Sequence, residues 1–149
     1  MSLHKCIHDL IIYLAMLKEY FNSQIRLILI GTPTSHFTLI SLHNLCNNLK
    51  LKFSHILDNS DIIFLSKIND KDLSTYYKCS SLFLYFSEHE GFCAPLVEAM
   101  NLGLPVIAHD IPAVAETLSD SGILINKYDC ESALKIITNV LTDTNYQKV

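Results

Sequence analysis

The sequence predicts an α/β fold in which helices cover both faces of a doubly wound, mostly parallel sheet. Two observations lead to this prediction. The segment Ile25–Ile30 is almost continuously apolar, which is typical of a strand buried on both faces of a parallel sheet. Similar short runs alternate along the chain with segments whose apolar residues have helical spacing. This βα alternation indicates a doubly wound topology.

The first half of the chain is expected to hold two helices and two strands. Residues 6–21 have the apolar spacing of an amphipathic helix, at Ile7, Leu10, Ile11, Leu14 and Leu17. A strand over 25–30 ends at Gly31, and a second helix is expected from about residue 37 to 49. The apolar residues 61–65 form the next strand.

The second half continues the same alternation. Asp70 is predicted to cap a helix that runs to about Cys79, because aspartate is a favoured N-cap residue. A helix is predicted to begin at Pro95, since proline is favoured at the first helical position. The remaining elements are strands over 82–85, 105–108 and 123–125, and helices over 113–118 and 130–141.

Length and charge exclude several classes of protein. We expect residues 1–149 to form a single domain, because no repeat, low-complexity tract or linker divides them. Half of the residues are hydrophobic and 17% are charged, as in a compact globule. The formal net charge of −4 argues against nucleic acid as a partner.

Cysteine and histidine positions argue against a metal site and against a disulfide framework. The five cysteines are odd in number and form no C-x-x-C pair, and the histidines form no H-x-x-x-H pair. A reducing cytoplasm fits such thiols best. No apolar run approaches the ~20 residues that span a bilayer, and Met1-Ser2-Leu3 does not begin a signal peptide.

The most informative segment runs from Glu90 to Met100. Two carboxylates, Glu90 and Glu98, flank a glycine-containing turn and Pro95. Because Ala94 offers no side-chain cap, the first N–H groups of the predicted helix are left available, and the positive end of the helix dipole attracts anions. The segment therefore predicts a phosphate site between two acids that can hold sugar or ribose hydroxyls.

Two other interpretations of the acid pair stay open at this point. Glu90 and Glu98 can be two solvated glutamates, with Glu98 near the positive end of the helix dipole. A retaining glycosidase also needs a pair of carboxylates. However, glycosidase acids flank an open sugar cleft, whereas these acids flank a helix N-terminus suited to phosphate.

A wider set of residues resembles a known family. The matching blocks are Ser87-x-x-Glu90-Gly91-Phe92-x-x-Pro95-Leu96-x-Glu98-Ala99-Met100, Gly103-x-Pro105-Val106-Ile107-Ala108, and Ile111-Pro112 with Glu116. This pattern resembles glycosyltransferase family 4. The segments Asp70–Lys78, Gly122–Ile125 and His4–Ile11 resemble further parts of the family's C-terminal domain, so the resemblance extends over nearly the whole chain.

The resemblance implies one half of a GT-B enzyme, in which two Rossmann-like domains face a cleft. This chain resembles the C-terminal, donor-binding domain of a retaining, hexosyl-transferring glycosyltransferase. The implied donor is a nucleotide diphosphate sugar, and the implied acceptor is a glycan or a lipid-linked glycan. No metal or other cofactor is expected. The full-length enzyme is expected to include an N-terminal acceptor-binding domain, and peripheral membrane association is compatible with this class.

The resemblance also implies roles for individual residues. Glu98 would accept hydrogen bonds from the ribose hydroxyls, and Glu90 would face the donor sugar. Lys5 would neutralise diphosphate charge. The donor would also be bound by the backbone N–H groups of Gly91, Phe92, Cys93 and Ala94, by Gly31 near the donor, and by Lys67 and Ile68 at the base.

Two departures from the family pattern accompany these roles. The family's arginine, about five residues before the lysine that matches Lys5, would fall before Met1, and Arg26 at the start of a strand is no counterpart. We therefore expect the chain to lack segments at both ends and to transfer no sugar alone. Cys93 occupies a position where glycine is commoner, and an inert, packed thiol is expected there.

Alternative interpretations of two residues and of the function also stay open. Lys5 can be a solvated residue near a fraying terminus, and Gly31 can be a plain strand-ending turn. The alternative functions are a GT-B-like sugar-nucleotide epimerase and a Rossmann-like module that binds a nucleotide without chemistry.

Overall fold

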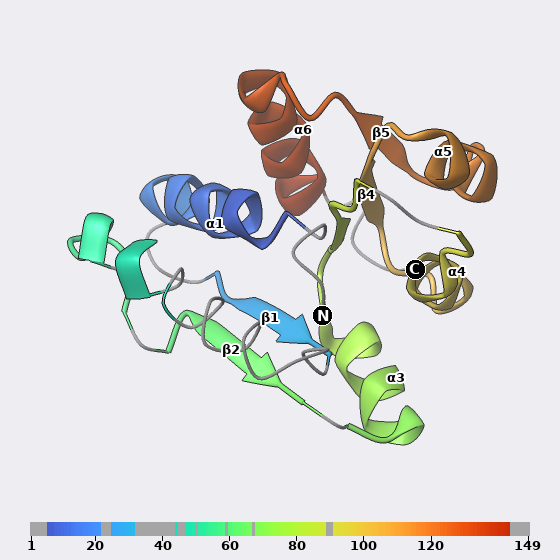
Figure 1. The fold of residues 1–149 in the computed structure, drawn as a ribbon, viewed down its shortest axis with the longest axis horizontal. Helices are drawn as coiled ribbons and strands as arrows, with labels where there is room; N and C mark the ends of the chain where they lie inside the picture. Colours follow the sequence, from blue (N-terminus) through green and yellow to red (C-terminus); the bar gives the residue numbers. More distant parts are fainter. Residues whose placement is uncertain are drawn as a thin grey trace. The chain divides into compact units, whose positions relative to one another are not determined.

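The computed structural model describes most of the chain, namely residues 6–21, 25–31, 44, 47–49, 51–58, 60–66, 68–88 and 91–143. It divides into two compact units, Met1–Ile68 and Asn69–Val149. Both units are built from parallel strands and helices (Figure 1). The α/β class with parallel strands and helices on both faces is thus confirmed.

The first unit contains one long helix and a pair of parallel strands. Helix α1 (Ile7–Phe21) buries the predicted apolar face and packs against β1 (Leu27–Ile30). Strand β1 pairs in parallel with β2 (Ile62–Leu65). The helix predicted over 37–49 falls largely outside the described residues. Residues 44 and 47–49, which the structure does describe, are helical.

A buried ion pair joins α1 to the start of β2. The ammonium group of Lys18 contacts the carboxylate of Asp61, and the two side chains are only 3% and 4% exposed. Asp61 also accepts a hydrogen bond from the backbone N–H of Asp58 at 2.6 Å. Each charge is therefore removed from water and depends on its partner for compensation.

The second unit is a three-stranded parallel sheet with connecting helices, in the strand order β3-β4-β5. In Figure 1, α4 and α5 lie on one side of this sheet and α6 lies on the other. Strand β4 is central, and all of its side chains are buried. In chain order the elements are α3 (Asp70–Cys79), β3 (Phe83–Tyr85), α4 (Ala94–Asn101), β4 (Val106–His109), α5 (Pro112–Leu118), β5 (Ile123–Ile125) and α6 (Cys130–Thr142).

The predicted cap of α3 is wrong by one residue. Asn69 is the N-cap, and its side-chain oxygen accepts from the backbone N–H of Asp72 at 2.9 Å. Its amide nitrogen also donates to the Asp72 carboxylate at 2.9 Å. Asn69 has the extended backbone that this exchange requires, whereas Asp70 lies inside the first turn, where its charge complements the helix dipole.

A glycine, Gly103, follows the C-terminus of α4 because the chain needs a left-handed residue there. The backbone N–H groups of Gly103 and Leu104 donate to the carbonyl groups of Met100 and Ala99, at 3.0 and 3.1 Å. This arrangement is a Schellman motif, and it needs a left-handed residue. Gly103 supplies that residue with φ 68°. The chain can then turn directly into β4, with Leu104 buried in the core.

The ion pair of the first unit gives a test of stability. We expect Lys18→Met to lower the free energy of unfolding by about 3–5 kcal/mol, because it leaves the Asp61 charge buried and uncompensated. Urea unfolding measures the effect. The double variant Lys18→Met/Asp61→Asn should recover part of the loss. Lys135→Ala, which breaks an exposed pair with Glu131, should barely move the midpoint. An equally small effect of Lys18→Met would contradict the assignment.

Candidate functional site

The candidate site lies where the chain leaves the carboxyl end of β3 and enters α4. Strands β3, β4 and β5 are parallel, so their carboxyl ends share one edge of the sheet. In open α/β sheets this edge is where ligands bind. Gly91 to Met100, the described part of the segment Glu90–Met100, spans the turn after β3 and most of α4.

The N-terminus of α4 carries no side-chain cap. Cys93, and not Ala94, is the N-cap residue, and the helix begins at Ala94 with Pro95 in its first turn. The Cys93 side chain is fully buried, and its Sγ atom lies 3.8 Å from the carbonyl oxygen of Ala113 in α5. The expected packed thiol is therefore observed, and it cannot fold back to cap the helix.

Two of the backbone amides at this turn belong to exposed residues, Gly91 and Phe92, whereas Cys93 is fully buried. Pro95 has no N–H, and the Ala94 N–H donates to the carbonyl oxygen of Phe92 at 2.9 Å. Among the described residues, none accepts a hydrogen bond from the N–H of Gly91, Phe92 or Cys93. Of the four amides named from the sequence, the one at Ala94 is therefore already engaged within the turn.

Gly91 is not explained by local packing. A Cβ atom added there would meet no described atom within 4 Å, and Gly91 does not adopt a positive φ. Neighbouring Phe92 is 80% exposed. Neither the backbone conformation nor a close neighbour therefore explains why a glycine stands at this position. The absence of a side chain leaves space for a ligand to approach the main chain closely.

Glu98 is exposed on α4 and accepts a hydrogen bond from a buried tyrosine. The Tyr77 hydroxyl of α3 donates to Oε2 of Glu98 at 3.2 Å, and it also lies 3.4 Å from the carbonyl oxygen of Pro95. Burial, and secondarily the Glu98 charge, raise the pKa of Tyr77 well above its usual value of 10.0. The hydroxyl therefore stays a neutral donor at physiological pH.

The sequence analysis assigned no role to Tyr77. The available signal was the spacing of Leu73 and Tyr77, four residues apart on an otherwise polar helix. This spacing identifies the face of α3 that packs inward, and Tyr77 brings a hydroxyl into that packed face.

Two further contacts tie the loops at this edge together. Lys127, after β5, donates to the Glu88 carboxylate, after β3, at 2.9 Å, and the hydrogen bond to Glu88 is the main reason that the pKa of Lys127 is raised. The rings of Phe86 and His109 stack with centroids 4.3 Å apart. These contacts connect the segment that follows β3 with β4, through His109, and with the turn after β5, through Lys127.

The remaining predicted residues belong to the first unit or fall outside the described residues. Gly31 follows β1, has φ 145° and donates its N–H to the carbonyl oxygen of Leu65 at 3.0 Å. Ile68 follows β2 and is partly buried. Lys5, Lys67 and Glu90 lie outside the described residues, so their predicted roles are untested.

Comparison with known families identifies the chain. The family model "Glycosyl transferases group 1" matches residues 1–149. The chain belongs to this family. The predicted resemblance to a glycosyltransferase is thereby confirmed at the level of group 1.

Curated relatives of this group 1 chain include bacterial mannosyltransferases. It is 30% identical over 100 residues to the serotype-specific mannosyltransferase WbdA of Escherichia coli, covering 67% of this chain and 12% of WbdA. It is 29% identical over 137 residues to the O-antigen chain mannosyltransferase RfbU of Salmonella typhimurium, covering 92% of this chain and 35% of RfbU. The group 1 chain thus spans about a third or less of these proteins.

Solved structures agree in fold. Anabaena Alr3699/HepE in complex with UDP-glucose superposes with a TM-score of 0.78 at 24% identity, over 99% of this chain and 38% of HepE. A trehalose-6-phosphate synthase superposes with a TM-score of 0.79 at 14% identity, over 98% of this chain and 36% of the synthase. The group 1 chain therefore has the Rossmann-like fold of one part of such enzymes.

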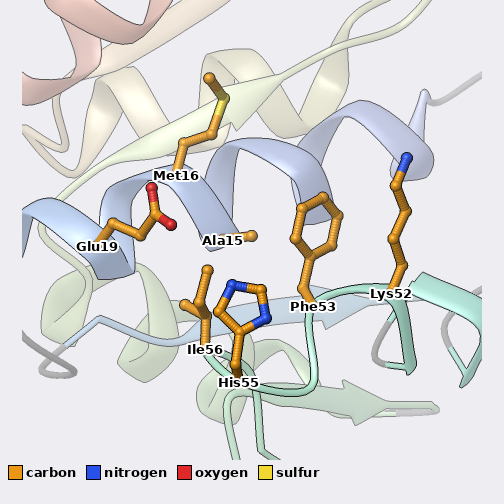
Figure 2. Close-up of a pocket in the computed structure, with 7 residues that line it drawn as sticks. All are labelled: Ala15, Met16, Glu19, Lys52, Phe53, His55 and Ile56. Carbon is orange, nitrogen blue, oxygen red and sulfur yellow. The ribbon is translucent and has the colours of Figure 1, made fainter.

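A shallow hollow elsewhere in the group 1 chain contains none of the predicted site residues. Its cavity volume is about 140 Å³, and side chains of α1 and of the segment 52–56 surround it (Figure 2). Helix α1 precedes β1 and the segment 52–56 precedes β2, whereas the predicted ligand-binding turns follow directly after strands. The lining residues are Ala15, Met16, Glu19, Lys52, Phe53, His55 and Ile56.

The described residues contain neither a cluster of metal-ligating side chains nor a helix that could span a membrane. No group of three or more His, Cys, Asp and Glu side chains in this part of the group 1 chain could hold a metal ion. None of the described helices is long and apolar enough to cross a bilayer.

The raised pKa of Tyr77 predicts a specific dependence of stability on alkaline pH. A raised pKa means that the folded state keeps the Tyr77 proton which the unfolded state loses near pH 10. The Tyr77 contribution to stability is therefore complete below pH 10 and declines above it. We expect the difference in unfolding free energy between the wild type and Tyr77→Phe to shrink from pH 9 to pH 11.5 in urea titrations. A constant difference would contradict the burial of a neutral hydroxyl.

Proposed function

We propose that this chain is the donor-binding domain of a retaining glycosyltransferase of family 4. In this proposal the whole enzyme moves a sugar from a nucleotide diphosphate sugar to a glycan or lipid-linked acceptor. One observation carries the proposal: an exposed carboxylate, Glu98, lies on a helix whose N-terminal turn leaves the N–H groups of exposed Gly91 and Phe92 without a described acceptor, in a chain of the group 1 family.

The chemistry of the site suits both parts of a nucleoside diphosphate. The N–H groups of Gly91, Phe92 and Cys93 precede an uncapped helix, where the dipole favours phosphate oxygens and donors also meet sugar hydroxyls. An ionised carboxylate is an acceptor only, so Glu98 is suited to the paired hydroxyls of a ribose. The open space beside Gly91 allows the ligand to reach the main chain.

Catalysis in this proposal is stabilisation of the leaving group. The diphosphate gains negative charge as the glycosidic bond breaks, and preorganised donors at the helix N-terminus lower that barrier. Lys5 would add a positive charge, and Glu90 would face the donor sugar. Gly31, Lys67 and Ile68 would contact the donor from the turns after β1 and β2. These roles are proposed because the residues stand at sequence positions that match the family pattern.

The rest of the proposed enzyme follows from the same resemblance. Transfer would retain the anomeric configuration and need no metal. An acceptor-binding domain would be supplied by a further part of the protein, since this chain covers 35% of RfbU and 38% of HepE. We also propose a cytoplasmic location, because none of the four described cysteines is in a disulfide.

Nucleotide titration of the chain tests the proposal. Glu98→Ala should weaken the binding of UDP or GDP about 10- to 100-fold, because hydrogen bonds to a charged group contribute roughly 1.5–3 kcal/mol. Inorganic pyrophosphate should bind the wild type and the variant about equally. Isothermal calorimetry measures both ligands.

A matched control uses a carboxylate at the opposite edge of the sheet. Asp120 is exposed and precedes the amino end of β5, so Asp120→Ala removes one negative charge away from the carboxyl edge. This variant should bind UDP and GDP like the wild type. Equal losses for nucleotide and pyrophosphate in Glu98→Ala would argue against ribose binding, and absence of nucleotide binding by the wild type at millimolar concentration would remove the basis of the proposal.

A further inference from the structure

We infer that Tyr77 is a positioning residue that orients the Glu98 carboxylate for the ribose hydroxyls. The inference rests on the proposed function and extends it to a residue of another helix. Its starting point is the hydrogen bond of 3.2 Å from the Tyr77 hydroxyl to Oε2 of Glu98.

Glu98 needs an external contact to hold one conformation. It is exposed on α4, and a solvated glutamate side chain samples several rotamers that lose their freedom when a ligand is bound. Among the described residues, the Tyr77 hydroxyl is the hydrogen-bond partner that the structure gives to this carboxylate. Since that bond engages Oε2, it restricts rotation of the carboxylate and leaves Oε1 to face a ligand.

Tyr77 itself is well anchored. Its residue is 8% exposed and belongs to the buried cluster of the second unit, together with Leu96 and Ala99 of α4. Its ring packs edge-on against Phe83, with centroids 5.6 Å apart. The oxygen of a hydroxyl on a fixed ring has a fixed position, whereas a donor on a flexible side chain would follow Glu98 as it moves.

The same hydroxyl relates Glu98 to the start of the helix. It lies 3.4 Å from the carbonyl oxygen of Pro95, in the first turn of α4. One buried O–H group is thus shared between the backbone that follows the available amides and the side chain proposed to hold the ribose. The hydroxyl of one residue of α3 therefore restrains the Glu98 carboxylate relative to the first turn of α4.

The charge state of the pair suits this role. Tyr77 cannot ionise at physiological pH beside Glu98, so it remains a donor while Glu98 remains an acceptor. A positively charged partner would instead neutralise Glu98 and compete with the ribose for it. A neutral donor orients the carboxylate and leaves its negative charge available to the ligand.

A double-mutant cycle tests the inference. The variants are Tyr77→Phe, Glu98→Ala and the combination, and the ligands are UDP and 2′,3′-dideoxy-UDP, which lacks the ribose hydroxyls. Phenylalanine keeps the ring packing and removes only the hydroxyl. We expect Tyr77→Phe to weaken UDP about 3- to 10-fold, as for the loss of one ordinary hydrogen bond. It should leave the dideoxy ligand unchanged, and it should add no loss for UDP when Glu98 is absent.

The control Tyr76→Phe removes a hydroxyl from the adjacent residue of α3, which makes no hydrogen bond to Glu98 among those described, and it should bind UDP like the wild type. A merely structural role of Tyr77 would weaken both ligands and persist in the Glu98→Ala background, which overturns the inference. If Glu98→Ala weakens UDP and Tyr77→Phe does not, the inference fails while the proposed function stands. If Glu98→Ala leaves UDP binding unchanged, both are overturned.

Discussion

Complete burial of β4 is the condition on which the second unit depends. All four side chains of Val106–His109 are inaccessible, and the strand pairs in parallel with β3 on one side and β5 on the other. A parallel strand of this kind must be covered on both faces, so each connection crosses from one edge of the sheet to the other through a helix. The chain is thereby obliged to turn into α4 at the carboxyl edge, where the N–H groups of Gly91 and Phe92 have no acceptor among the described residues.

The Cys93 side chain packs in the core and leaves the N-terminus of α4 without a side-chain cap. The usual N-cap residues would use a side-chain oxygen to satisfy the first amides. Cys93 instead directs its sulfur into the core, toward Ala113 of α5, and forms no cap. Packing between α4 and α5 therefore leaves the cap position without a competing acceptor. A glycine at this position would also leave the amides open, but it would lose the buried contact.

Secondary-structure elements could be predicted from the sequence where a local residue pattern is compatible with only one type of element. Continuous apolar runs located all five described strands to within one or two residues, although only β4 is buried along its whole length. Boundaries were less certain, since Asn69 and Asp70 are both good capping residues and only the backbone geometry of Asn69 decides between them. The predicted start of α4 was Pro95, whereas the helix begins at Ala94. The reason is similar, because proline is accepted throughout the first turn of a helix.

The candidate site was predictable as a segment, whereas its supporting contacts were not. Glu98 and the amides of Gly91, Phe92 and Cys93 are neighbours in the chain, so one motif contains them. Tyr77 donates to Glu98 from 21 residues away, and Lys127 reaches Glu88 from 39 residues away. Such pairs depend on how α3 packs against α4 and on which strands are adjacent, and neither is encoded by local spacing.

The two supporting contacts also differ in what they can contribute. The side chains of Lys127 and Glu88 are 34% and 42% exposed, so water and salt screen their attraction. Their pairing therefore restrains the loops only weakly. The Tyr77 hydroxyl is sheltered, and a hydrogen bond to a carboxylate in such surroundings is stronger than one in water. The geometry of the Glu98 carboxylate therefore depends mainly on the packed interior of the second unit.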